Sequence, residues 1–123
     1  MNMKILIVDD DITFVNGIKL FLESRTIPAA TATNVAEAKR ILNAEKISLI
    51  CTDWDLGDGT GLDVLQYASG KKIPVVFLTG HDEDSYNERA KAMGVVRYYI
   101  KGQVSYREVI NDLITLWEKN GEI

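Results

Sequence analysis

Five polar residues with complementary chemistry stand at the ends of four separate apolar runs in this chain. They are the carboxylates of Asp9, Asp10 and Asp53, the hydroxyl of Thr79 and the ammonium of Lys101. In an open parallel sheet the carboxyl ends of the strands share one edge, and ligands bind there. We therefore expect these residues to converge on one acidic pocket with a hydroxyl and an ammonium at its rim. Such groups suit a divalent metal ion and a phosphoryl group.

The acidic residues allow two interpretations. Carboxylates crowded at the end of a buried strand repel one another unless a cation neutralises them. Mg²⁺ does so in many proteins, binding one or two carboxylates while keeping several waters. Taken alone, the triplet Asp9–Asp11 could simply favour the start of the first helix, since acids stabilise helix N-termini. The matching positions of Asp53, Thr79 and Lys101 favour the metal site.

Short apolar runs alternate with longer amphipathic segments, the pattern of an α/β protein with a parallel sheet. The weakest of the runs is the second, which consists mostly of Ala and Thr. The runs predict strands near 4–8, 29–33, 48–53, 74–79 and 96–100.

The amphipathic segments predict helices near 12–24, 35–45, 61–69, 83–93 and 105–119. Near the start of three of them, an Asn or Ser is followed three residues later by Glu. In such a pair, side-chain oxygens accept hydrogen bonds from the free amides of the first turn. The pairs are Asn34 with Glu37, Ser85 with Glu88, and Ser105 with Glu108.

Composition limits the class of protein. The 123 residues suffice for one domain, predicted to span 1–123 with no output domain after it. A net charge of −4 argues against direct nucleic-acid binding, which requires clustered Lys and Arg. No apolar stretch approaches the ~18 residues of a membrane span, and no signal peptide is expected before the first strand. Cys51 is the only cysteine, so a reducing, cytoplasmic setting is expected.

These motifs resemble the receiver domain of bacterial two-component response regulators, in particular the single-domain chemotaxis-type regulators. The resemblance covers essentially the whole chain. Its carriers are the Asp9–Asp10 pair, the segment 53–61, Thr79 with a small residue after it, and Tyr98 three residues before Lys101. The resemblance implies a flavodoxin-like, doubly wound five-stranded parallel sheet with strand order 2-1-3-4-5 and five flanking helices.

By this resemblance, Asp53 is the phosphoacceptor, which receives a phosphoryl group from a histidine kinase or a histidine phosphotransfer protein. Asp10 and Asp53 bind Mg²⁺ directly, together with the backbone carbonyl of Asp55, and Asp9 acts through a metal-bound water. The residue chemistry agrees, because a carboxylate can act as the nucleophile that forms an acyl phosphate. Phosphoryl transfer needs positioning and charge neutralisation more than covalent help.

The resemblance assigns the remaining residues to the phosphoryl group and to a switch. Lys101 pairs with phosphoryl oxygens, Thr79 donates a hydrogen bond to one of them, and Gly80 beside it leaves a wide entry. Tyr98 changes rotamer together with Thr79. The signal would leave through the face formed by the helix near 83–93, the strand near 96–100 and the helix near 105–119. A downstream protein or a missing output domain would receive it there.

Two further loop positions border the phosphoryl group in this family and tune its lifetime. They are held here by Asp55, two residues after Asp53, and by His81, two residues after Thr79. His81 could equally be a plain exposed loop residue.

Two glycines depart from the family pattern. Gly57 replaces a usual proline, which predicts a looser loop after the third strand. Gly102 follows Lys101 where the family usually has a cis-proline, and a trans bond is expected here because a cis bond to a non-proline residue costs about 3 kcal/mol.

Two rival functions deserve comparison. A haloacid-dehalogenase-like phosphohydrolase also uses an aspartyl nucleophile with a second Asp two residues later, as in Asp53-Trp54-Asp55. In that class, however, the nucleophile strand comes early and the acidic pair late, the reverse of the order here. A phosphate-independent pseudo-receiver that acts as a binding module usually lacks an acidic residue or the lysine, and this chain keeps them all. The sequence therefore predicts a signalling switch that is not a turnover enzyme.

Overall fold

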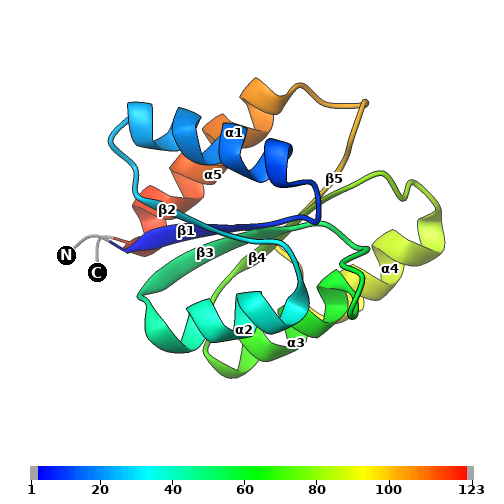
Figure 1. The fold of residues 1–123 in the computed structure, drawn as a ribbon. Helices are drawn as coiled ribbons and strands as arrows, with labels where there is room; N and C mark the ends of the chain where they lie inside the picture. Colours follow the sequence, from blue (N-terminus) through cyan, green and yellow to red (C-terminus); the bar gives the residue numbers. More distant parts are fainter. Residues whose placement is uncertain (1–2, 122–123) are drawn as a thin grey trace.

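Strands and helices alternate regularly along the chain in a computed structural model that describes residues 3–121 (Figure 1). Their bounds lie within two residues of those predicted from the sequence. The strands are β1 (Lys4–Val8), β2 (Ala29–Ala32), β3 (Ile47–Thr52), β4 (Val75–Thr79) and β5 (Arg97–Ile100). The helices are α1 (Ile12–Ser24), α2 (Val35–Ala44), α3 (Gly61–Gly70), α4 (Asp84–Ala92) and α5 (Tyr106–Gly121).

The five strands form one parallel sheet in the order β2-β1-β3-β4-β5, as expected. The register aligns the carboxyl ends of the strands. Val8 lies opposite Thr52 between β1 and β3, and Thr79 lies opposite Ile100 between β4 and β5. This alignment brings the residues after each strand to the same edge of the sheet.

Helices cover both faces of the sheet. Figure 1 shows α1 and α5 over one face and α2, α3 and α4 over the other. Every residue of β3 and β4 is buried, as expected for parallel strands with helices on both sides. Two separate cores result, one that contains Phe77 and residues of α2, α3 and α4, and one that contains Ile7 and residues of α1 and α5.

Two of the predicted capping pairs are confirmed. The Asn34 side chain accepts a hydrogen bond from the amide of Glu37 at 2.8 Å, at the start of α2. At the start of α5, the Ser105 hydroxyl accepts from the amide of Glu108 at 3.1 Å. These bonds satisfy amides that have no partner within the helix.

The capping prediction at α4 was wrong. The helix begins at Asp84, so Ser85 lies inside it, and Glu83 at the cap position makes no side-chain cap bond. The structure instead contains a capping box at α3 that the sequence analysis missed. There Thr60 accepts from the backbone while its own amide donates to the Asp63 carboxylate at 2.9 Å.

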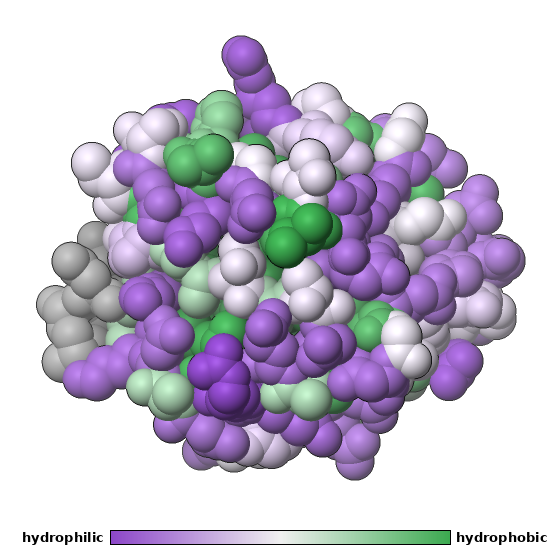
Figure 2. Space-filling view, viewed as in Figure 1, coloured by the Kyte–Doolittle hydropathy of each residue, from purple (hydrophilic) through white to green (hydrophobic). Residues whose placement is uncertain are grey.

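The outer surface is mixed in polarity. Figure 2 shows one face, on which hydrophobic side chains are scattered among hydrophilic ones. This is the expected outer side of amphipathic helices whose apolar stripes face the sheet. Within residues 3–121, no helix combines the length and the apolar character that crossing a bilayer requires.

Candidate functional site

The carboxyl edge of the sheet brings the predicted site residues together. The amide of Asp53 donates to the carbonyl of Val8 at 2.9 Å, which places Asp53 beside the end of β1. The amide of Lys101 donates to the carbonyl of Thr79 at 2.8 Å, which fixes the end of β5 against β4. Because these are backbone bonds of the sheet, the strand register itself positions the site.

Three carboxylates form a cluster at this edge. One oxygen from each of Asp9, Asp10 and Asp53 can be chosen so that all three lie within 4.8 Å of one another. Asp9 is buried, whereas Asp10 is exposed. Hard divalent cations prefer such oxygen ligands, so the donor set fits Mg²⁺.

Lys101 neutralises part of this charge. Its ammonium lies 2.8 Å from Asp9 Oδ2 and 3.2 Å from Asp53 Oδ2, and it also stands 5.0 Å from the centre of the Phe14 ring. Burial lowers the pKa of Lys101, but the hydrogen bond with Asp9 and the nearby carboxylates outweigh burial and raise it. Lys101 therefore stays charged at neutral pH.

Burial has the opposite effect on Asp9. Desolvation raises the pKa of Asp9 above its usual value, and the hydrogen bonds from Lys101 and from the amide of Asp11, at 3.0 Å, only partly offset it. The charged carboxylate is thus held in an unfavourable setting, which a bound cation would relieve.

The two oxygens of Asp53 face different partners. Oδ1 accepts from the amide of Trp54 at 2.6 Å, and Oδ2 accepts from Lys101. The side chain is 14% exposed, so it is reachable from solvent while being held in place. The Asp53 carbonyl is approached so closely by Gly61 that an added Cβ there would lie 2.3 Å from it.

The side chains of Thr79 and Tyr98 both form hydrogen bonds with the backbone of the loop after β4. The hydroxyl of Thr79 accepts from the amide of His81 at 3.3 Å, and the hydroxyl of Tyr98 donates to the carbonyl of His81 at 2.8 Å. The Tyr98 ring stacks on Phe77 with centroids 5.7 Å apart. Burial raises the pKa of Tyr98 to about 12, so its hydroxyl remains a donor at neutral pH.

Asp55 and His81, the two positions named as tuning candidates, contact each other directly. His81 Nε2 lies 2.6 Å from Asp55 Oδ2, and the imidazole stacks on Tyr86 with centroids 4.3 Å apart. The hydrogen bond with Asp55 raises the pKa of His81. His81 is therefore anchored between Asp55 and Tyr86, a relation that the spacing of Asp55 and His81 in the sequence did not reveal.

The two glycine departures have different outcomes. The Lys101–Gly102 peptide is trans, as expected. The loop that contains Gly57 is tied by hydrogen bonds, and its looseness relative to a proline-containing loop stays a prediction. Its Leu56 amide donates to the Gly59 carbonyl at 3.2 Å, and the Asp58 side chain bonds to α2. The Asp58-Gly59 pair in the sequence is a signal for such a turn.

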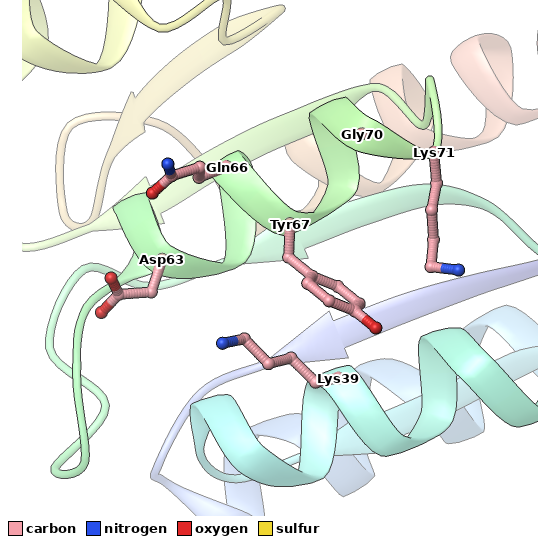
Figure 3. A pocket seen from close by; sticks show the side chains of 6 residues that line it. All are labelled: Lys39, Asp63, Gln66, Tyr67, Gly70 and Lys71. Carbon is pink, nitrogen blue, oxygen red and sulfur yellow. The ribbon is translucent and has the colours of Figure 1, made fainter.

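A separate hollow of about 500 Å³ lies between α2 and α3. Figure 3 shows Lys39 and Lys71 on either side of the Tyr67 ring. Their nitrogens lie 5.4 and 5.6 Å from its centre. The hollow contains none of the residues predicted to act at the carboxyl edge.

Asp10→Asn is expected to raise the Tm of the metal-free protein by a few degrees, because it removes one of three crowded like charges. Added Mg²⁺ should raise the Tm of the wild type, since a ligand that binds only the folded state stabilises it. The variant should gain much less. Thermal unfolding followed by circular dichroism, with and without Mg²⁺, measures both effects. A metal-free variant less stable than the wild type would contradict the crowding argument.

Comparison with known proteins assigns the family. Residues 5–113 match the family model described as "Response regulator receiver domain". The photosynthetic apparatus regulatory protein RegA of Rhodovulum sulfidophilum is 32% identical over 97% of this chain and 63% of its own length. The acid tolerance regulatory protein ActR of Sinorhizobium medicae is 34% identical over 80% of this chain and 52% of its own length. The chain therefore spans between about half and two thirds of these two relatives.

Solved structures agree on the fold. A CheY-like receiver domain from Methanospirillum hungatei JF-1 superposes with a TM-score of 0.89, at 22% identity over 99% of this chain and 98% of that one. A two-component response regulator from Clostridium difficile gives a TM-score of 0.86, at 27% identity over 96% and 98%. The chain belongs to the response regulator receiver domain family, and its fold is the flavodoxin-like fold of CheY-type receivers.

Proposed function

We propose that this receiver domain is a phosphorylation-dependent switch that accepts a phosphoryl group on Asp53. The observation that carries the proposal is the setting of the Asp53 carboxylate. It lies between the Lys101 ammonium and the Trp54 amide, beside the buried Asp9 and the exposed Asp10. A nucleophile held this way has cationic and hydrogen-bonding partners for the charge that arrives with a phosphoryl group.

An Asp53 oxygen would form the new bond to phosphorus while the bond from phosphorus to the donor breaks. With a histidine kinase or a histidine phosphotransfer protein, the leaving atom is an imidazole nitrogen, which takes up a proton. Lys101 would then pair with a phosphoryl oxygen, as lysine does in other phosphate sites. Thr79 would donate a hydrogen bond to another, and Gly80 would leave the approach open.

Mg²⁺ would supply positive charge that offsets the repulsion between carboxylates and phosphate. We propose that Asp10, Asp53 and the backbone carbonyl of Asp55 would hold it, with Asp9 acting through a metal-bound water. Asp55 and His81 would border the phosphoryl group and tune its lifetime.

The output would leave through α4, β5 and α5, and Thr79 and Tyr98 would relay it. Partners on either side would be a histidine kinase or phosphotransfer protein, and a downstream protein or an output domain. Residues 1–123 would form one receiver unit that is not a turnover enzyme. The cytoplasmic setting predicted from the single cysteine stays a prediction.

The test is phosphoryl uptake from a small donor. With acetyl phosphate and Mg²⁺, intact-mass measurement should show the addition of one phosphoryl group per chain, and chelation of Mg²⁺ should prevent it. In a steady-state assay with small phosphate esters, no multiple turnover is expected. Failure of the wild type to gain a phosphoryl group would overturn the proposal, and sustained ester hydrolysis would point to a phosphohydrolase.

A further inference from the structure

The loop between β3 and α3 is fastened to a helix that is distant in the sequence. Asp58 Oδ1 accepts a hydrogen bond from the amide of Val35 at 2.8 Å, and Oδ2 accepts from the amide of Ala36 at 3.0 Å. Both amides belong to the first turn of α2. One carboxylate thus joins the tip of the loop to α2 with two bonds.

Local conformation brings the tip of the loop to this helix. Gly57 adopts φ +79°, a left-handed conformation that glycine reaches without strain. The amide of Asp58 then donates to the Leu56 carbonyl at 2.9 Å, which closes a tight turn. An added Cβ on Gly59 would lie 3.1 Å from Val35 Cγ2, so glycine also permits close packing against α2.

The bonds at the start of α2 are complementary. Asn34 accepts from the amide of Glu37, and Glu37 in turn accepts from the amide of Thr33 at 2.8 Å. Asp58 accepts hydrogen bonds from the two first-turn amides, those of Val35 and Ala36, that these local caps do not satisfy. A carboxylate at a helix N-terminus also interacts favourably with the helix dipole. The hydrogen bonds from α2 lower the pKa of Asp58, so it remains charged at neutral pH.

The same loop supplies a predicted metal ligand. Asp55 and Thr60 form an antiparallel bridge at the base of the turn, and the amide of Gly61 donates to the Trp54 carbonyl at 2.7 Å. The segment 55–60 is therefore a closed turn, with Asp55 at its base and Asp58 at its tip. Fixing the tip restricts how the base can move relative to Asp53.

We infer that Asp58 is a positioning residue for the Mg²⁺ site, which it serves by fastening the turn that carries the Asp55 carbonyl to α2. The inference rests on the proposed function, since it takes the Asp55 carbonyl as a ligand. Asp58 itself contacts neither the carboxylate cluster nor the phosphoacceptor. When Asp58 fastens the turn to α2, the turn has fewer conformations in the metal-free protein. Less ordering is then needed when the cation binds.

The test compares Mg²⁺ affinity among variants through the fluorescence of Trp54, the residue after Asp53. Trp117 in α5 is the other tryptophan of the chain, so a Trp117→Phe background removes its signal. Asp58→Ala is expected to weaken Mg²⁺ binding about tenfold, the lower end of the effect of removing outer partners of a metal site. Asp58→Asn keeps an acceptor oxygen for only one of the two amides and should recover part of the affinity. Asp82→Ala removes an exposed carboxylate that makes no such bond to α2, and it controls for the change in charge.

Amide hydrogen exchange gives a second readout. Exchange at Val35 and Ala36 should become faster in Asp58→Ala and should stay slow in Asp82→Ala. Unchanged Mg²⁺ affinity in Asp58→Ala, despite faster exchange, would overturn the inference. Equal weakening in Asp58→Ala, Asp58→Asn and Asp82→Ala would also overturn it, because charge alone would then explain the loss. A wild type that binds no Mg²⁺ would instead contradict the proposed metal site itself.

Discussion

Asp53→Asn is expected to take up no phosphoryl group from acetyl phosphate under conditions in which the wild type is modified. The amide is a far weaker nucleophile than the carboxylate, and it removes one negative charge from the proposed metal site. Its near-identical shape should preserve the fold, because an oxygen remains to accept from the Trp54 amide. Intact mass and peptide mapping measure the uptake and the modified position.

Asp55→Asn is the matched control. It changes the same functional group two residues away, but the Asp55 side chain is 70% exposed, and only its backbone carbonyl is proposed as a ligand. We therefore expect Asp55→Asn to be phosphorylated, with a changed lifetime because its contact with His81 is altered. Uptake at the wild-type rate by Asp53→Asn would show that the nucleophile lies elsewhere.

The positions of the strand ends could be predicted because the local sequence pattern and the general topology of parallel sheets were sufficient to locate them. Apolar runs closed by polar residues located the strands, and a parallel sheet necessarily gathers its carboxyl ends at one edge. The convergence of Asp9, Asp10 and Asp53 at one edge and the ammonium of Lys101 beside them are thus confirmed, whereas the ion pairs of Lys101 with Asp9 and Asp53 were not predicted. The residue roles in phosphoryl transfer stay predictions.

Contacts between loops could not be predicted in the same way. The pairing of Asp55 with His81 and the bond of Asp58 to α2 join residues more than 20 positions apart, through turns whose paths the sequence does not specify. Gly57 illustrates the difficulty. Its replacement of proline suggested a looser loop, but its left-handed conformation is part of the turn that brings Asp58 to α2. The effect of a glycine depends on the partners that its conformation makes available.

The Tyr98 hydroxyl bonds the loop that follows Thr79, and this contact gives the proposed switch a concrete form. Both side chains bond the backbone of His81, Thr79 through its amide and Tyr98 through its carbonyl. If the Thr79 hydroxyl turns to a phosphoryl oxygen, the His81 amide loses its partner and the loop must adjust. The population of the conformer in which the Tyr98 ring stacks on Phe77 would then change. This change would carry the signal to β5 and α4.

Thr79→Ala is therefore expected to accept the phosphoryl group but to transmit it poorly. Moving a two-state switch from mostly off to mostly on requires about 5 kcal/mol of differential contact. A hydrogen bond to a charged group contributes about 1.5–3 kcal/mol, so its loss should lower the on/off ratio of the modified protein roughly 10- to 100-fold. Amide chemical shifts with and without beryllofluoride, in the wild type and the variant, measure that ratio.

Two further variants test whether the relay requires the hydroxyl groups of Thr79 and Tyr98. Thr79→Ser keeps the hydroxyl and should restore the shifts in α4 and β5 that Thr79→Ala loses. Tyr98→Phe keeps the ring but removes the bond to the His81 carbonyl, so it should accept beryllofluoride and respond weakly in the same elements. In the wild type, chemical-shift changes could instead stay confined to the loops around Asp53, with α4 and β5 unchanged. That result would show that this relay does not operate, because beryllofluoride binding at Asp53 would then leave the partner surface unaffected.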